Sequence, residues 1–208
     1  MRVRPISSEL LVEELCDRME ATPRERWLRV AIDGPPPATP EDLADTLVGP
    51  MRARGRDVVR VSARDFLRPA SLRYEFGRHD PDVYYDNWLD VGGLVREVLA
   101  PLEPGGTGKV LPSLWNSVLD RATRAQYLAV PAGGILLLDG SLLLGRGLPF
   151  DLTIHLHLSA GALARRTEDD EAWTLPAYTR YQQQAQPRRN ADVVIKMDDP
   201  RHPALLEK

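Results

Sequence analysis

The chain has 208 residues, of which 43% are hydrophobic and 27% are charged, a composition typical of a globular protein with one sizeable core. Its formal net charge of −3 provides no basic field for a polynucleotide, so we expect no nucleic-acid partner. The single cysteine, Cys16, excludes an intrachain disulfide, and the N-terminal residues contain no uninterrupted apolar run. These features predict a cytoplasmic protein without a membrane segment.

The first sixty residues predict the start of an α/β fold. A serine-capped amphipathic pattern indicates a helix over about 8–19. One side of this helix is expected to hold three leucines, Leu10, Leu11 and Leu15. A buried strand is expected at 27–33, followed by a proline-rich turn and a helix over about 40–54. A second strand at 57–62 would complete a right-handed βαβ unit.

The middle of the chain is less regular. Residues 67–87 are rich in arginine, aspartate and tyrosine, which favours an irregular loop over a binding site. A helix is expected over about 90–99. The segments 109–119 and 124–130 fit a small antiparallel hairpin, and residues 105–109 between them and the helix predict a turn.

The last third of the chain predicts the rest of the sheet. Apolar runs at 134–139 and 151–158 indicate central parallel strands. Helices are expected over 159–166 and 175–186, and a last strand over 191–196. This order predicts one α/β domain with a doubly wound parallel sheet. Within residues 1–208 we expect three parts: an N-terminal helix in 1–23, a core in 24–200 and a frayed tail in 201–208.

Several short patterns follow one another in a fixed order along the chain. They are Ala31-Ile-Asp-Gly34, Ser62-Ala-Arg-Asp-Phe66, Asp80-Pro-Asp-Val-Tyr-Tyr-Asp86, Leu137-Leu-Asp-Gly140, Leu163-Ala-Arg-Arg166 and Ala191-Asp-Val-Val-Ile195. Together they resemble the phosphoribulokinase and uridine kinase family of P-loop kinases. The resemblance implies the P-loop fold of nucleoside kinases, with a small lid over the site.

The phosphate-binding loop is where the chain departs from this family. Such kinases follow the first strand with a glycine-rich loop that offers backbone N–H groups, a lysine and a magnesium-binding hydroxyl. The corresponding residues here are Gly34, Pro35, Pro36, Pro37, Ala38, Thr39, Pro40 and Glu41. Because proline has no backbone N–H, and proline and glutamate stand where lysine and hydroxyl belong, we expect a degenerate Walker A loop. Normal ATP-dependent phosphoryl transfer is then expected to be lost.

The same residues are also a good helix start. Thr39 suits the N-cap, Pro40 the first helical position, and Glu41 and Asp42 match the positive end of the helix dipole. Their negative charge would repel an ATP phosphate. The simpler interpretation is that this segment is only a stable, capped helix.

Further roles are implied by the resemblance and apply only if the protein is an active enzyme. Asp65 corresponds to the base that accepts the substrate proton, although it also suits a plain turn. Arg165 and Arg166 correspond to lid arginines, but an acidic segment, 167–171, follows them. Asp139 corresponds to a carboxylate that supports Mg²⁺. ATP and Mg²⁺ are expected as cofactors only if kinase activity persists.

The acceptor nucleoside would be held in the tyrosine-rich region. The residues that the resemblance places there are Arg73, Tyr74, His79, Tyr84, Tyr85 and Asp86. The alternative is a tyrosine-rich loop that packs on its own domain. His155 and His157 alternate along an apolar strand, and with no cysteine or third histidine nearby a hydrogen-bonded strand residue is favoured over a zinc pair.

Two functions, and a third interpretation, follow from these patterns. The leading hypothesis is a uridine kinase-like pseudokinase that binds a nucleoside, another small polar ligand or a protein partner. The alternative is an active nucleoside-type phosphotransferase, or a divergent enzyme that uses the acceptor cleft. The third is a structural subunit, and a homo-oligomer would suit such a role.

Overall fold

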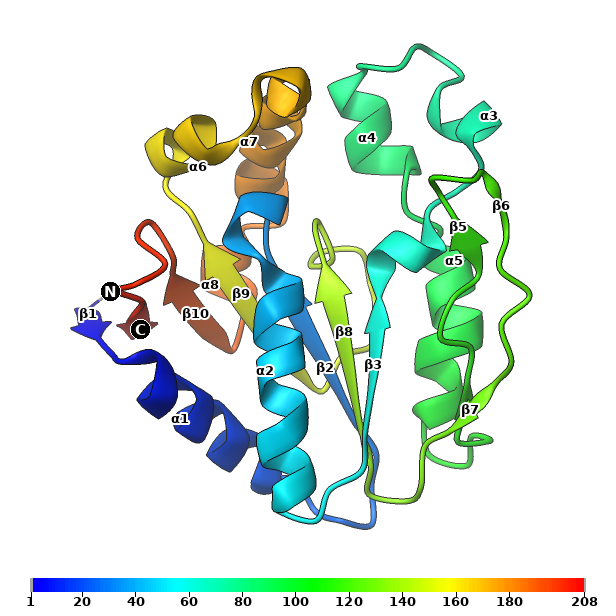
Figure 1. The fold of residues 1–208 in the computed structure, drawn as a ribbon, viewed down its shortest axis with the longest axis vertical. Coiled ribbons are helices and arrows are strands. Elements are labelled where there is room, and N and C mark those ends of the chain that lie inside the picture. Colours follow the sequence, from blue (N-terminus) through cyan, green and yellow to red (C-terminus); the bar gives the residue numbers. More distant parts are fainter. Residues whose placement is uncertain (1, 208) are drawn as a thin grey trace.

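The computed structural model describes residues 2–207, which build a seven-stranded sheet in the order β1-β11-β10-β9-β2-β8-β3 (Figure 1). Five strands run parallel, and they are β3 (Val58–Ser62), β8 (Ile135–Gly140), β2 (Leu28–Asp33), β9 (Leu152–His157) and β10 (Val193–Lys196). Two antiparallel strands, β11 (Ala204–Glu207) and β1 (Arg2–Pro5), extend one edge. The predicted mostly parallel α/β sheet is confirmed.

Both faces of the central strands are covered. Every residue of β2 and β8 is buried, as expected for parallel strands with helices on either side. Along β8, Ile135 and Leu137 pack in one core with α1 (Ser8–Glu20) and α2 (Pro40–Ala53). Leu136 and Leu138, which alternate with them, pack in a second core that includes residues from 94 to 102.

Helix α1 begins as the serine cap predicts, because the Ser7 side chain accepts a hydrogen bond from the Leu10 backbone N–H. Its buried face differs from the prediction in one position. The side chain of Leu10 is 45% exposed, whereas the helix buries Leu11, Leu15, Cys16 and Met19. Residues 11, 15 and 19 repeat every four positions and so lie on one side of a helix, from which residue 10 is turned away.

The expected irregular loop over 67–87 is partly helical, so that prediction is wrong. It contains α3 (Ala70–Arg73) and α4 (Pro81–Asn87). The carboxylate of Asp80 caps α4 by accepting from the backbone N–H groups of residues 82 and 83. An aspartate followed by proline is a helix-start signal that the polar composition of the segment concealed. The helix expected over 90–99 consists of α5 (Val91–Leu94), a π turn (Val95–Leu99) and a 3₁₀ turn (Ala100–Leu102).

The insertion after this helix is a pair of short antiparallel ladders. Strand β4 (Lys109–Val110) pairs with β7 (Leu128–Ala129), and β5 (Trp115–Asn116) pairs with β6 (Arg121–Ala122). The predicted antiparallel hairpin is therefore present as two ladders, with the β5–β6 pair lying between β4 and β7 along the chain.

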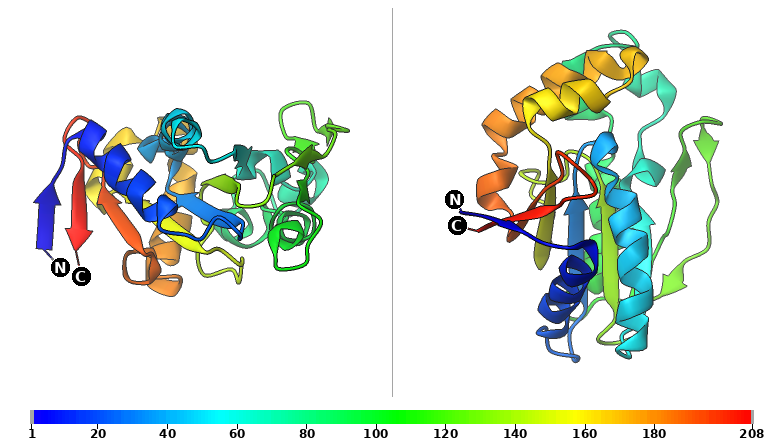
Figure 2. Two further views of the ribbon diagram at one scale, coloured as in Figure 1. Left: turned by 90° about the horizontal axis from the view of Figure 1, so that it is seen from below. Right: turned by 60° about the vertical axis from the view of Figure 1, so that its left-hand side comes forward.

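The lid region follows β9. It consists of α6 (Ala160–Arg166), a 3₁₀ turn (Asp169–Thr174), α7 (Leu175–Gln184) and α8 (Pro187–Asn190). Helices α6 and α7 lie over the upper end of the sheet (Figure 2), and α8 returns to contact β9. The predicted frayed tail is wrong, because residues 204–207 form β11 between β10 and β1. No helix within residues 2–207 has both the length and the apolarity that crossing a bilayer requires.

Gly34 provides a test of how closely the first loop packs on the sheet. A Cβ atom at this position would lie 2.9 Å from the Leu156 Cβ, so Gly34→Ala should overpack the core and lower the free energy of unfolding by about 1–3 kcal/mol. Gly49, inside α2, has no atom within 4 Å of an added Cβ. Gly49→Ala should stabilise by about 0.5–1 kcal/mol. Urea denaturation measures the free energy of unfolding of both variants. Equal changes in Gly34→Ala and Gly49→Ala would contradict the close contact of Gly34 with Leu156.

Candidate functional site

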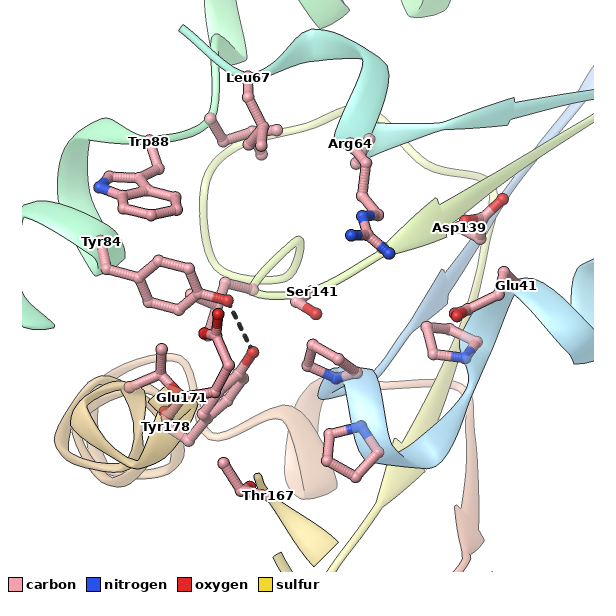
Figure 3. A pocket seen from close by; sticks show the side chains of 18 of the residues that line it. Glu41, Arg64, Leu67, Tyr84, Trp88, Asp139, Ser141, Thr167, Glu171 and Tyr178 are labelled. Carbon is pink, nitrogen blue, oxygen red and sulfur yellow. Dashed lines mark hydrogen bonds between the residues drawn. The ribbon is translucent and has the colours of Figure 1, made fainter. Parts of the chain in front are cut away.

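A cavity of about 450 Å³ lies at the carboxyl ends of the central strands. Its floor comes from the residues that follow β2, β3 and β8, and its other walls come from α4, the lid 3₁₀ turn and α7 (Figure 3). Ligands bind outside the carboxyl ends of the strands in open α/β sheets, and this volume is within the range of small-molecule sites. The cavity is therefore the candidate binding site.

The loop after β2 forms one wall of this cavity. Residues 36–38 make a 3₁₀ turn, Thr39 has a left-handed backbone with φ 50° and ψ 58°, and α2 begins at Pro40. Thr39 occupies the N-cap position, but its side chain makes no capping hydrogen bond. The expectation of a hydroxyl cap is wrong, because a capping side chain reaches the helix N–H groups from an extended backbone.

Backbone N–H groups are scarce in this loop. Four of the eight residues from 34 to 41 are prolines, which have no N–H. The amide of Gly34 donates to Gly140 at 3.0 Å, that of Ala38 to Pro35 at 2.8 Å and that of Thr39 to Pro36 at 2.9 Å. Within this described loop only the Glu41 amide is left, and the residues by which the loop lines the cavity are Pro36, Pro37, Pro40 and Glu41.

A lid arginine is bonded to the same loop. The guanidinium of Arg166, at the end of α6, donates to the Pro37 carbonyl and, at 2.8 Å, to the Met197 carbonyl. Arg166 also lines the cavity, whereas the exposed Arg165 does not. The structure thus brings one of the two predicted lid arginines to the site and ties it to a backbone carbonyl.

Asp139 ends β8 and is only 2% exposed. Arg60 Nε donates to its Oδ1 at 2.7 Å, and the Ser62 hydroxyl donates to its Oδ2 at 3.0 Å. Arg60 also contacts Asp45 of α2 at 2.8 Å. Within residues 2–207 no group of three or more acidic, histidine or cysteine side chains is arranged to hold a metal ion. The predicted metal ligand is thus engaged in an ion pair.

In the 3₁₀ turn after β3, the side chains of Arg64 and Asp65 point in different directions. Arg64 lines the cavity and its guanidinium points into it (Figure 3), whereas Asp65 is not among the lining residues. Burial raises the pKa of the Asp65 carboxyl, partly offset by a hydrogen bond with Ser113. The residue proposed as a base therefore lies beside the cavity wall, and its neighbour occupies the wall itself.

Of the six residues expected to hold an acceptor, only Tyr84 lines the cavity. Arg73 is only 4% exposed and is not a lining residue. Its guanidinium carbon lies 4.9 Å from the centre of the Tyr74 ring. His79 packs on Trp173, with 5.4 Å between ring centres.

Tyr85 and Asp86 belong to a separate contact between α4 and α7. Arg180 lies 4.5 Å from the centre of the Tyr85 ring and donates to the Asp86 carboxylate at 2.8 Å. These two side chains therefore join the lid to α4 outside the cavity lining.

Several lining residues were not foreseen, namely Arg64, Trp88, Ser141, Arg146, Glu171 and Tyr178. Tyr178, on α7, places its hydroxyl 2.9 Å from the hydroxyl of Tyr84, on α4. Burial raises the pKa of both phenols, so both stay protonated. The sequence carried only one signal for this group, an apolar and aromatic face on the helix over 175–186.

A buried carboxylate lies at the end of β2, just before the loop that lines the cavity. Asp33, the last residue of β2, is 0% exposed. Its oxygens accept from the Leu143 backbone N–H at 2.9 Å and from the Tyr181 hydroxyl at 2.8 Å, and the His155 Nδ1 lies 2.7 Å away. His155 is thus a hydrogen-bonded strand residue, as predicted.

Comparisons with known proteins agree on the fold. No protein-family model matches the chain, and no curated protein sequence is similar enough to count as a match. A solved structure described as a possible uridine kinase from Bacillus stearothermophilus superposes with a TM-score of 0.73 at 20% identity, over 89% of this chain and 98% of that one. The D-glycerate 3-kinase from Cryptococcus neoformans gives a TM-score of 0.61 at 13% identity, over 89% and 92% of the two chains. The fold is that of P-loop kinases, as the sequence patterns predicted.

The phenol pair allows a double-mutant test of the contact between α4 and the lid. Tyr178→Phe removes one hydroxyl and leaves the half-buried Tyr84 hydroxyl without its partner, so it should lower the free energy of unfolding by about 0.5–1.5 kcal/mol. Changing both tyrosines to phenylalanine should cost less than the sum of the single changes. Chemical denaturation of the four proteins measures the coupling, and additive effects would show that the hydroxyls do not interact.

The buried His157 predicts an acid-sensitive fold. Burial, followed by electrostatic repulsion from His155 and Arg188, lowers the pKa of His157 from 6.5 to about 4. Between these pH values the unfolded chain binds a proton that the folded chain does not, so stability falls as the pH drops from about 6.5 to 4, by about 2–3 kcal/mol.

Denaturation series at several pH values check this effect. His157→Gln should flatten the pH dependence across that window, while the matched change at His202, whose side chain is 77% exposed, should leave it unaltered. An unchanged slope in His157→Gln would show that this histidine does not titrate as proposed.

Proposed function

We propose that this chain is a uridine kinase-like pseudokinase, which keeps the ligand cavity of the kinase fold and has lost normal ATP-dependent phosphoryl transfer. The observation that carries the proposal is the loop over residues 34–41. Its four prolines have no N–H, and the amides of Gly34, Ala38 and Thr39 are already bonded to other carbonyls. A triphosphate needs several such amides directed at its oxygens.

The energetic deficit is large enough to matter. Each charge-assisted hydrogen bond contributes about 1.5–3 kcal/mol, so the loss of two removes roughly 3–6 kcal/mol. Millimolar to micromolar binding corresponds to about 4–8 kcal/mol in total. Glu41 lines the cavity where a lysine-bearing loop would be positive. Its negative charge would repel the phosphates and weaken ATP binding further.

The remaining phosphate-handling groups are engaged elsewhere. Arg166 donates to the carbonyls of Pro37 and Met197, so two of its five N–H donors are held by the backbone and are withdrawn from a transferred phosphoryl group. The carboxylate of Asp139 holds Arg60 and Ser62, and the positive charge of Arg60 opposes a divalent cation there. These contacts support a site that binds without phosphoryl transfer.

A small ligand is favoured over a purely structural role because the cavity has a suitable volume, about 450 Å³. The alternative, an active nucleoside-type phosphotransferase with Asp65 as base and ATP and Mg²⁺ as cofactors, needs the Asp65 carboxylate to reach the acceptor. Because Asp65 lies outside the lining, the pseudokinase is the better-supported function.

Calorimetry and an activity assay test the proposal together. Titration with Mg·ATP to about 1 mM should give no binding heat, since the amide donors are missing, and no phosphoryl transfer to uridine or cytidine should be detected. An active uridine kinase measured in parallel controls for the assay. Micromolar Mg·ATP binding with phosphorylation of either nucleoside would restore the phosphotransferase alternative.

A further inference from the structure

Arg64 differs from the other arginines that line the cavity. Two of the three donate to backbone carbonyls: Arg146 to residues 142 and 85, and Arg166 to residues 197 and 37. Across the part of the chain that the structure describes, the Arg64 guanidinium has neither a hydrogen bond nor an ion pair. Its guanidinium, which carries five N–H donors, points into the cavity (Figure 3).

The backbone beneath Arg64 is firmly held. It belongs to the 3₁₀ turn Ala63–Phe66, in which the Asp65 carbonyl accepts from Leu114 at 3.0 Å and the Phe66 carbonyl accepts from Asp90 at 2.8 Å. Arg64 is exposed to solvent, and a charged group on a rigid turn that points into a cavity can pair with an anionic ligand there.

The charges around the cavity decide which anion suits it. The lining contains three arginines and three glutamates, in addition to Asp139, which is neutralised by Arg60; the glutamates are Glu41, Glu168 and Glu171. A phosphate monoester carries a charge of about −1.5 to −2, and these glutamates would repel it. A single negative charge can be met by Arg64 alone, and a carboxylate matches the planar guanidinium with two parallel hydrogen bonds.

The rest of the lining favours an apolar ligand body. The indole N–H of Trp88 donates to the Arg73 carbonyl at 3.1 Å, and the Tyr84 and Tyr178 hydroxyls bond to each other at 2.9 Å. These side chains therefore bring mainly ring surface to the cavity, and the two phenol oxygens (Figure 3) keep lone pairs that can accept. Other lining rings are those of Pro36, Pro37 and Pro40.

The lining hydroxyls are also occupied. Ser141 donates to the Gly34 carbonyl at 2.7 Å, Thr167 to the Leu163 carbonyl at 2.8 Å and Thr174 to the Glu171 carbonyl at 2.8 Å. Few donors are left to read the polar edge of a base, so ring stacking and apolar contact dominate binding in this cavity.

We propose that the cavity binds an organic acid with an aromatic or apolar body and a single carboxylate, which pairs with Arg64. This inference rests on the proposed function, because it specifies the ligand of the same site. It identifies the small polar ligand as a monoanion, and it makes Arg64 the residue that selects the headgroup.

Three probes with one ring system and different headgroups test the inference by calorimetry at neutral pH and low salt. They are 1-naphthylacetate, the neutral 1-naphthylacetamide and 1-naphthyl phosphate. The carboxylate should bind at least about tenfold more tightly than the amide, because it alone gains charge-assisted hydrogen bonds. It should also bind more tightly than the phosphate, and competition with Mg·ATP should be absent.

Two variants locate the effect. Arg64→Gln should weaken carboxylate binding at least about tenfold and leave amide binding unchanged, while Arg165→Gln, at an exposed residue outside the cavity lining, should change neither. Arg64→Lys keeps the charge and should recover part of the affinity. Thermal melting confirms that each variant is folded.

Several results would overturn the inference. They are equal affinity for acid and amide, tighter binding of the phosphate, no effect of Arg64→Gln, or no binding of the carboxylate at about 5 mM, which corresponds to roughly 3 kcal/mol. None of these alters the prediction that ATP is not used. Phosphoryl transfer from ATP would instead remove the proposed function and leave the headgroup preference to be judged by the three probes.

Discussion

The buried carboxylate of Asp33 is the contact on which the arrangement of the site depends. It ends the central strand β2, and it binds the backbone of the loop after β8 through Leu143, the lid helix α7 through Tyr181, and β9 through His155. A buried charge is costly unless it is fully hydrogen-bonded, so these three elements are held in one relative position. The cavity walls include the same loop and the same helix, through Leu142 and Tyr178.

The loop after β2 forms the wall of the cavity that differs most from a phosphate-binding loop. Similar structures establish only the fold, and one fold supports many functions. In this chain the space beside the start of α2 is bordered by proline rings, internally bonded amides and the carbonyl that accepts from Arg166. The lid is thereby joined to the loop through protein groups alone.

Much of the fold follows from local patterns, whereas the site does so only in part. The strands over 28–33 and 135–140 could be predicted because apolar runs of strand length are buried on both faces. The turn at 63–66 could be located by its position after a strand, but its side-chain directions could not. Whether Arg64 or Asp65 faces the cavity depends on contacts with residues 90 and 113–114, which lie far along the chain.

The sequence by itself determined the mostly parallel sheet and the lack of N–H donors at four loop positions, because apolar periodicity and the proline ring are local properties of the chain. Tertiary structure decided the rest. Only folding pairs residues 2–5 with 204–207 at the sheet edge, brings Arg60 to Asp139, and turns Arg64 into the cavity. Each of these contacts joins segments that no local pattern relates, since the energy of a non-local contact depends on the position of both partners in the folded chain.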